Sequence, residues 1–283
     1  MAELMQIRQR IAAIATIKKI THAMRLISMS SHTRLKTKEK SLTAYTKILT
    51  ALFQTAKSHV SDWHNTVLQP SPSTQENQLV ILIGSDKGLC GNFNTTLFYF
   101  FEEYLSSYNP ETTTYVAIGK KAIDYLEQKK KIIPSLVYKQ LSANSLPAIA
   151  RALVDHITLK PTPYQSVTVF SNILKTFFLQ KPEKTILIPF EALLATMPES
   201  DNSDFYWEQN GQEVVDFLAK QVIKGTLEYL LFQSLIAEQA SRFISMDNST
   251  RNADRLLEST KLQYNKLRQA TITKELAELS GSF

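Results

Sequence analysis

Both ends of the chain carry the hydrophobic spacing of long helices. In the C-terminal part, from Gln212 to Phe283, apolar side chains recur every three or four positions and no proline occurs. This spacing is typical of a helix with one buried face. At 1.5 Å per residue, a helix over residues 212–280 would be roughly 100 Å long. A helix of that length without breakers indicates a coiled coil or a helical shaft.

The N-terminal part supplies the partner for this helix. Residues 1–69 contain neither glycine nor proline, and we predict a helix from Ala2 to about Lys57. Its apolar stripe steps by three and four through Leu4, Ile7, Ile11, Ile14, Ile17, Ile20, Met24 and Ile27. Neither stripe keeps a strict heptad, because residues 17–20 interrupt the first and residues 247–251 the second. We interpret both interruptions as local stutters in an antiparallel coiled coil.

The middle of the chain, where all ten prolines lie, alternates between strands and helices. Buried strands are predicted at 79–84, 114–118, 167–170 and 185–189, with a weaker one at 132–138. Helices are predicted at 95–107, 120–130 and 146–159. Phe177 and Phe178 could form a further strand, joined to the last one through Lys181 and Pro182. This order predicts a three-layer α/β domain with a mostly parallel sheet.

The predicted fold class is therefore α/β plus a long antiparallel α-helical coiled coil. The N- and C-terminal helices form a shaft, and the three-layer α/β domain is inserted between them. The predicted boundaries are 1–69 for the N-terminal helix, 70–210 for the Rossmann-like domain and 211–283 for the C-terminal helix.

Charge is concentrated in the N-terminal helix. Residues 1–57 hold eleven Lys and Arg against two acidic residues, a net of +9 in a chain whose net charge is +6. The open interpretations are an acidic protein partner, a phospholipid surface, nucleic acid, or simply a solvated helix face. Nucleic acid is disfavoured, because the basic helix carries only Tyr45 and Phe53 as aromatic residues and no binding motif.

Composition excludes several kinds of site. Cys90 is the single cysteine, so no intrachain disulfide is possible. The five histidines are scattered, and His59 and His64 are poorly spaced to hold a metal ion on a helix. No apolar run reaches eighteen residues, so we expect no membrane insertion. We expect neither a metal nor a cofactor.

The loop from Ser85 to Asn94 is the obvious candidate for chemistry. Gly88 and Gly91 follow a predicted strand, as in a phosphate-binding turn, but the GK[ST] and GxGxxG patterns are missing. Cys90 has no histidine near it in the sequence to activate it as a nucleophile. We therefore predict that Gly88, Cys90 and Gly91 form a structural loop, with the glycines allowing a tight turn and close packing.

Three segments in register carry a family resemblance. They are IRQRIAAIATIKKITHAMRLIS near the N-terminus, the loop GSDKGLCGNFN, and YNKLRQATITKELAEL near the C-terminus. Together they resemble the gamma subunit of the F-type ATP synthase over the whole chain. Three departures stand out. Asn92 replaces a glycine, Arg251 replaces an acidic residue, and residues 30–36 follow the family's basic pattern only loosely.

The resemblance implies a central-stalk rotor subunit without catalytic residues or cofactors. It would couple proton flow through the membrane ring to ATP synthesis or hydrolysis at the beta subunits by rotation. Implied partners are the alpha, beta and epsilon subunits, delta in the same complex, and the c-ring. The implied location is the cytoplasmic side of a bacterial inner membrane, as a peripheral protein, and the absence of a transit peptide also favours a bacterial origin. The alternatives are an α/β-domain enzyme with an oligomerising coiled coil, or a basic coiled coil acting on nucleic acid.

The resemblance also implies contact residues. Beta-subunit contacts are expected at Lys18, Lys19, Met24, Arg25, Arg268, Gln269 and Thr273. Contacts with the membrane ring and epsilon are expected at Phe205, Tyr206, Trp207 and Glu208. Apolar side chains near the C-terminus, among them Leu276, Leu279 and Phe283, would turn in an apolar sleeve, since apolar contact is non-directional.

Overall fold

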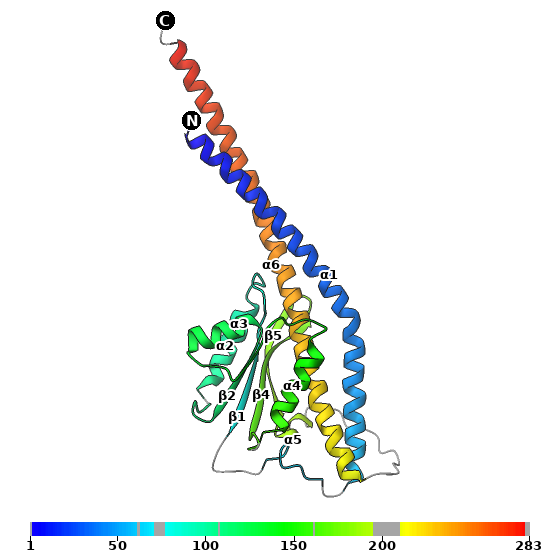
Figure 1. Cartoon of the computed structure of the whole chain (residues 1–283). Coiled ribbons are helices and arrows are strands. Elements are labelled where there is room, and N and C mark those ends of the chain that lie inside the picture. The colour runs from blue at the N-terminus through cyan, green and yellow to red at the C-terminus, as the bar shows by residue number, and fades with distance from the viewer. Residues whose placement is uncertain are drawn as a thin grey trace. The chain divides into compact units, whose positions relative to one another are not determined.

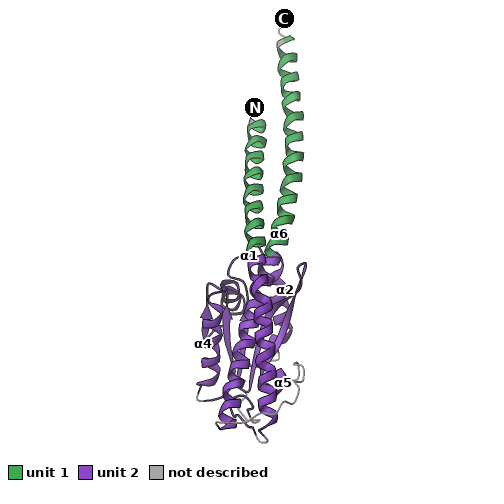
Figure 2. Cartoon of the chain, turned by 90° about the vertical axis from the view of Figure 1, so that its right-hand side faces the viewer, with its two compact units in different colours: residues 1–30, 242–283 green, residues 31–241 purple. Residues whose placement is uncertain are grey.

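The computed structural model describes residues 2–60, 63–70, 77–106, 108–160, 162–194 and 210–280 (Figure 1). The chain divides into two compact units, which Figure 2 distinguishes by colour. Unit 1 comprises Met1–Ser30 and Arg242–Phe283, and unit 2 comprises Ser31–Ser241. The domain boundaries drawn from the sequence at residues 69 and 210 remain a prediction.

The two long helices predicted from the sequence are present. Helix α1 spans Ala2–Ser58 and helix α6 spans Gly211–Ser280, so each contributes to both units. Both reach these lengths because no proline occurs within them and, after its first residue Gly211, α6 contains glycine only at Gly225. Within unit 1 the partners of α1 come from α6 in reverse order, from Lys18 with Asp254 to Arg25 with Asp247. The predicted antiparallel pairing of the helices is confirmed.

The residues that pack between the two helices, here called the seam, differ from those predicted from the sequence. The least exposed positions of α6 in unit 1 follow a strict alternation of three and four residues, and so do those of α1. On α1 the series is Leu4, Ile7, Ile11, Ile14, Lys18, Thr21, Arg25 and Ser28, and on α6 it is Met246, Thr250, Ala253, Leu257, Thr260, Tyr264, Leu267 and Thr271. The expected stutters are absent, and Ile17, Ile20 and Ile27 are 53%, 54% and 65% exposed. The prediction failed because polar side chains with partners across the seam hold the heptad positions there.

Unit 2 is built on a five-stranded sheet in the order β3-β2-β1-β4-β5. The strands are β1 (Gln78–Ile83), β2 (Thr113–Ile118), β3 (Leu136–Tyr138), β4 (Ser166–Thr176) and β5 (Leu179–Ile188). Strand β1 lies at the centre and pairs in parallel with β2 and β4; β2 pairs in parallel with β3, and only β4 and β5 are antiparallel. The mostly parallel sheet is therefore confirmed.

Helices cover both faces of the sheet. Leu79, Ile81 and Ile83 of β1 enter a core shared with α4 (Leu146–Thr158), α5 (Phe190–Leu194) and the unit 2 parts of α1 and α6. Val80 and Leu82 enter the opposite core, under α2 (Phe93–Leu105), α3 (Lys120–Asp124) and the π-helical turn η1 (Tyr125–Lys130). All five of these side chains are fully buried, which explains the unbroken apolar run of this strand.

Two local predictions differ from the structure. Phe177 and Phe178 form the turn between β4 and β5, whereas Lys181 and Pro182 lie within β5. A proline is tolerated there because β5 is an edge strand, which does not need every backbone N–H for pairing. The weak strand predicted at 132–138 is reduced to the three residues of β3.

Adding a methyl group at two glycines of unit 2 should change the stability of the chain in opposite directions. Gly119 has a φ of +88°, and a Cβ there would lie 2.3 Å from the carbonyl oxygen of Gly84. Gly225 lies inside α6, where a Cβ would meet Leu49 Cδ2 of α1 at an ordinary 3.4 Å. We expect Gly119→Ala to destabilise the chain by about 2 kcal/mol or more. Gly225→Ala should stabilise it by about 0.5–1 kcal/mol through helix propensity.

Thermal unfolding of the full chain, followed by far-ultraviolet circular dichroism, checks both variants in one experiment. A lower midpoint for Gly225→Ala would mean that α1 and α6 pack more tightly there than the structure shows. An unchanged midpoint for Gly119→Ala would contradict the left-handed backbone at that position.

Candidate functional site: the paired helices and the first loop of the sheet

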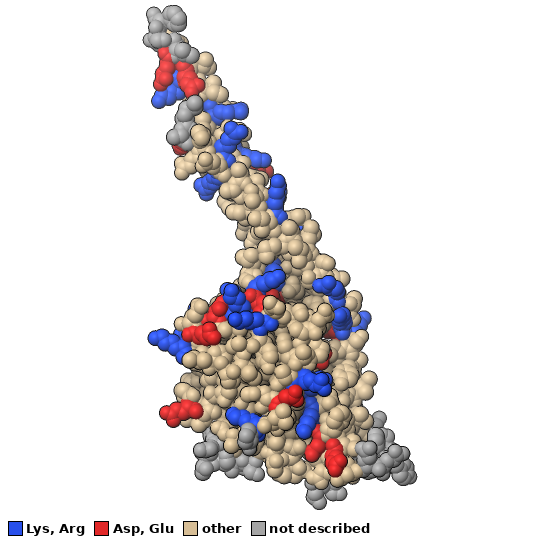
Figure 3. Space-filling view, in the orientation of Figure 1, with Lys and Arg blue, Asp and Glu red and all other residues tan. Residues whose placement is uncertain are grey.

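Unit 1 carries the whole net charge of the chain. Its two segments contain twelve Lys and Arg against six Asp and Glu, a net of +6, so the charges of unit 2 balance. Figure 3 shows more basic than acidic side chains on the visible face of these helices. Such a surface attracts an acidic partner at long range.

Part of this charge is used inside the helix pair. Arg25 Nη1 donates to Asp247 Oδ1 at 2.6 Å, and Arg251 Nη2 lies 2.9 Å from Asp247 Oδ2. The side chains of Arg25 and Asp247 are only 26% and 16% exposed. The hydrogen bond from Arg25, followed by the charge of Arg251, holds the pKa of Asp247 below its usual value. Lys18 pairs with Asp254 in the same way at a more exposed position.

Two threonines continue the polar seam between these ion pairs. Thr250 Oγ1 lies 2.9 Å from Thr21 Oγ1 and 2.7 Å from the carbonyl oxygen of Met246. Both threonines are buried, at 9% exposure for Thr21 and 5% for Thr250. Because each hydroxyl has a partner, no polar atom of either side chain is left without a hydrogen bond inside the seam.

The substitution at Arg251 is accommodated by this cluster. Asp247 lies one turn before Arg251 and accepts its guanidinium, so the basic residue meets a carboxylate on its own helix. Asn92, a second departure, precedes α2 with φ −88° and ψ 5°, a conformation open to any residue. Nothing in the backbone at residue 92 requires a glycine.

The other predicted contact residues of unit 1 are available on its surface. Lys19, Arg268, Gln269 and Thr273 are exposed, and Met24 is half-buried. Thr273 Oγ1 donates to the carbonyl oxygen of Gln269 at 2.9 Å, which places these two residues on one face of α6. Lys18 and Arg25 differ from this group because their charges already have intrachain partners.

Apolar side chains accompany the charges on the outside of the helices. Ile17, Ile20 and Ile27 form a stripe on α1 beside the seam, and Leu262, Ile272 and Leu276 are exposed on α6 at 60%, 48% and 61%. The described part of unit 1 thus presents both apolar and basic groups outward. The side chains of Leu279 and Phe283 lie outside this description.

The loop after β1 is held together by its own polar groups. Asn94 Nδ2 donates to Ser85 Oγ at 2.8 Å and lies 3.3 Å from Cys90 Sγ, while Ser85 Oγ donates to the carbonyl oxygen of Lys87 at 2.8 Å. Cys90 is only 2% exposed and packs with Phe93 and Ala237 of α6. Its thiol is therefore not accessible to a substrate.

This loop also connects neighbouring elements of unit 2. The carboxylate of Asp86 accepts backbone N–H groups from Lys120, at 3.1 Å, and from Leu141, so it ties together the loops after β1, β2 and β3. Ser241 Oγ of α6 donates to the carbonyl oxygen of Cys90 at 2.7 Å. Gly91 has a φ of +58°, whereas a Cβ added at Gly88 would meet only Lys121 Cε, at 4.0 Å.

Sequence reasoning missed the residues that hold the seam. The predicted interruptions at 17–20 and 247–251 contain the seam positions Lys18 and Thr250, although Lys18 lies four residues after Ile14 and Thr250 four after Met246, as the heptad requires. The expected contacts with the ring and epsilon, Phe205, Tyr206, Trp207 and Glu208, lie outside the described residues.

The described residues offer no group of three His, Cys, Asp or Glu side chains that could hold a metal ion. Among the helices described, none combines the length and apolarity needed to cross a bilayer.

The arrangement defines a class of protein: an α/β domain inserted between two chain ends that pair as an antiparallel coiled coil. Comparison with known proteins identifies the family. The family model described as ATP synthase matches residues 3–283. The ATP synthase gamma chain of Clostridium perfringens (strain SM101 / Type A) is 31% identical over 284 residues, covering 99% of this chain and 97% of the relative. That of Pelagibacter ubique is 27% identical over 99% of this chain and 98% of its own. The chain belongs to the ATP synthase gamma chain family.

Solved structures show the same fold. A chain in the mitochondrial ATP synthase of Euglena gracilis, described as OSCP/F1/c-ring in rotational state 3, aligns with a TM-score of 0.70 and 17% identity, covering 99% of this chain and 93% of its own. A chain of the rotor of that enzyme in rotational state 1 aligns with a TM-score of 0.63 and 16% identity, covering 96% and 99%.

The Asp247 cluster predicts a pH-dependent contribution to stability. Its folded pKa is depressed, so the stabilisation is present above the unfolded value of 3.8 and is lost as the pH falls through the folded pKa. We expect Asp247→Asn to cost up to about 1 kcal/mol at pH 7. The difference from the wild type should shrink steadily below about pH 4, as the carboxyl becomes protonated in both states.

Thermal unfolding of both proteins between pH 3 and pH 7 measures this difference. Asp254→Asn is the matched control, because its ion pair with Lys18 is more exposed, with side chains 40% and 52% accessible. Equal losses in the two variants would show that burial of Asp247 adds nothing.

Proposed function

We propose that the chain is the central-stalk rotor subunit of an F-type ATP synthase. It would couple proton flow through the membrane ring to ATP synthesis or hydrolysis at the beta subunits by turning, without catalytic residues of its own. The observation that carries this proposal is the end-to-end match to gamma chains, which includes both helices of unit 1. The fold shared with a chain of a mitochondrial ATP synthase rotor supports it.

The helix pair of unit 1 has the properties that such a role needs. Its seam keeps one register over eight successive heptad positions on each helix, with ion pairs at Lys18 and Arg25 and a hydrogen bond between the hydroxyls of Thr21 and Thr250. A polar seam resists sliding of one helix along the other, because sliding would bury charges without partners. Torque applied at one end of such a pair is transmitted as a rotation of the whole unit.

The outer surface of unit 1 is suited to contacts that form and break. Apolar side chains such as Ile17, Ile20 and Leu276 give contact without preferred direction, so they do not resist turning. Basic side chains would add contacts with acidic groups at particular angles. We propose that Lys19 and Met24 on α1, and Arg268, Gln269 and Thr273 on α6, contact beta subunits in this way. Lys18 and Arg25 would act mainly through the seam.

The partners proposed are the alpha, beta, epsilon and delta subunits and the c-ring of the same complex. The segment of Phe205, Tyr206, Trp207 and Glu208 is proposed to contact the ring and epsilon. The chain would be held at the cytoplasmic face of a bacterial inner membrane by these partners and not by insertion.

Co-purification from membranes tests the assignment. A tagged chain should bring down alpha, beta and epsilon subunits and the ring in fixed proportion. The purified chain alone should show no ATP hydrolysis, whereas the complex should. Recovery of the tagged chain without these subunits, or nucleotide turnover by the chain alone, would reject the proposal in favour of an α/β-domain enzyme.

Arg268 gives a sharper test of the contact surface. Its guanidinium is exposed and makes no ion pair with another described residue, so it can pair bidentately with a carboxylate of a beta subunit. Such a charge-assisted bond contributes about 1.5–3 kcal/mol. We expect Arg268→Leu to lower membrane ATPase activity about tenfold or more, or to weaken assembly of the complex on the stalk, and Arg268→Lys to retain part of the function.

Circular dichroism of the isolated subunit is the control for this variant, because an exposed helix position contributes little to the fold. Wild-type ATPase activity and assembly in Arg268→Leu would reject the contact. A reduced helical signal would mean that Arg268 serves the helix and not a partner.

A further inference from the structure

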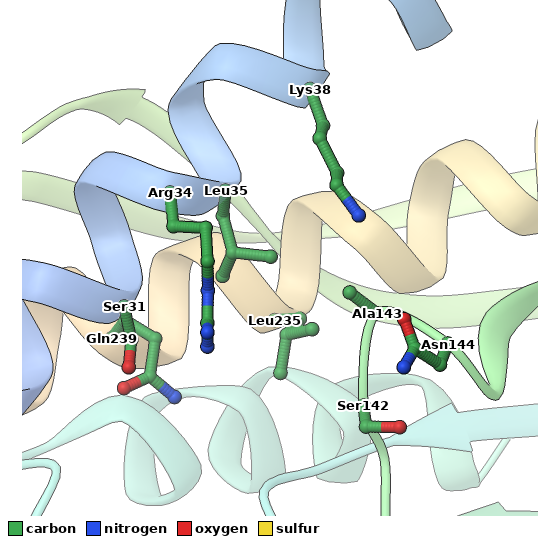
Figure 4. A pocket seen from close by; sticks show the side chains of 9 residues that line it. All are labelled: Ser31, Arg34, Leu35, Lys38, Ser142, Ala143, Asn144, Leu235 and Gln239. Atoms are coloured by element: carbon green, nitrogen blue, oxygen red, sulfur yellow. The ribbon is translucent and has the colours of Figure 1, made fainter.

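A cleft in unit 2 collects positive charge without a carboxylate to balance it. It has a volume of about 300 Å³ and lies between α1, α6 and the loop that follows β3. Nine residues line it: Ser31, Arg34, Leu35, Lys38, Ser142, Ala143, Asn144, Leu235 and Gln239. Figure 4 shows Arg34 and Lys38 extending from α1 into the same space, with Ala143 and Asn144 on the opposite side.

The two cations lie close together on exposed positions of α1. Arg34 and Lys38 are four residues apart on one helix, so their side chains are neighbours and repel each other. Within the described chain, neither makes an ion pair. The next acidic side chain along the helix, Glu39, forms an ion pair with Lys36 Nζ at 2.5 Å and accepts a hydrogen bond from Gln233 Nε2 at 3.0 Å.

The rest of the lining supplies hydrogen-bond donors from other directions. Ser31 contributes a hydroxyl, and Asn144 and Gln239 contribute amides, whereas the Ser142 hydroxyl donates to Ser145 Oγ at 3.1 Å. Ser142, Ala143 and Asn144 stand shortly before the first turn of α4, a helix of thirteen residues. The partial positive charge of that helix end adds to the two cations. Leu35 and Leu235, both 6% exposed, form an apolar side that limits access of water.

The cleft also lies at an edge of the sheet where α/β proteins commonly bind ligands. The loop carrying Ser142 and Asn144 follows β3, at the edge of the sheet where β1, β2 and β3 all end. In open α/β sheets, ligands are commonly held by the loops at this edge. Here the loop is held in place by the bond from the Leu141 N–H to Asp86, so the donors do not depend on the ligand for their position.

We propose that this cleft binds a phosphate group. A phosphate offers acceptor oxygens in several directions, which matches a guanidinium fork, an ammonium group and neutral donors converging from two sides. The volume is at the low end for small-molecule sites, so it takes free phosphate or the phosphate end of a nucleotide, with the base left outside. All nine lining residues belong to unit 2, and the inference does not rest on the proposed rotor function.

Equilibrium dialysis of the full chain against radiolabelled inorganic phosphate, at constant ionic strength set with chloride, tests the proposal. We expect saturable binding of one phosphate per chain. Arg34→Gln and Lys38→Gln should each weaken binding about tenfold, and the double variant more strongly, because each removes a charge-assisted bond. Arg34→Lys should lose less than Arg34→Gln.

The control is Lys40→Gln, which removes the same charge from an exposed position of α1 that does not line the cleft. It should leave phosphate binding within about twofold, since a charge outside the cleft is screened by salt. Circular dichroism of every variant confirms that the fold is kept. A second arm with ATP separates the sources: tighter binding of ATP than of phosphate assigns the site to a nucleotide tail, and the reverse assigns it to free phosphate.

Three results would overturn the proposal. The first is no saturable binding of either ligand. The second is equal phosphate affinity in the wild type and the double variant. The third is binding of a fluorescent glutamate peptide that depends on Arg34 and Lys38 while phosphate does not compete, because this would make the cleft a docking place for an acidic protein segment.

Discussion

The heptad pairing of α1 with α6 in unit 1 is the constraint on which the helical part of this protein depends. A helix of 57 residues and one of 70 residues would each expose their apolar stripe if they stood alone. Their pairing covers Ile14, Met246 and Ala253, and it does so without a gap because the seam keeps its period through polar positions. Ion pairs and paired hydroxyls replace apolar contact there. Since Lys18, Thr21 and Arg25 meet their partners on α6 in only one alignment of the two helices, these positions select a single register.

The polar seam also determines what the outer surface looks like. With Lys18, Thr21 and Arg25 turned to the partner helix, Ile17, Ile20 and Ile27 are turned to solvent. The apolar groups that composition would assign to a core are therefore on the outside, beside a surplus of basic side chains. For a subunit that turns against its neighbours, this exchange is useful: directional contacts are kept within the moving part, and non-directional ones face its surroundings.

Unit 2 depends on a different kind of junction. Asp86 and the loop around Cys90 join the ends of three parallel strands to each other and to α6, through hydrogen bonds to backbone groups. The contacts of this loop are those of a structural element, since the Cys90 thiol is buried and Ser85 and Asn94 are hydrogen-bonded to each other. The same junction orders the start of the loop leading into α4, where the basic cleft lies.

Much of this could be derived from the sequence alone. The absence of glycine and proline from residues 2–58 determined α1, the apolar run 79–83 determined the central strand, and the alternation of elements determined the mostly parallel sheet. These features are local, because each depends on the propensity and periodicity of its own segment. Even the family resemblance was visible in short motifs in order. The hairpin differs from the prediction because proline usually favours a turn, and only the position of β5 at the edge of the sheet explains why Pro182 lies within a strand.

Only the tertiary structure decided which face of α1 is buried. By hydrophobicity, Ile17 and Ile20 belong to a core, and Lys18 and Thr21 do not. The choice is reversed by Asp254 and Thr250, more than two hundred residues away, whose acceptors make burial of the polar stripe favourable. In the same way, residues 34 and 38 line a cleft only because the loop at 142–144 lies near them in the folded chain. Periodicity along one segment records how its own side chains alternate, but the energy of burying a polar group depends on a partner that another segment supplies.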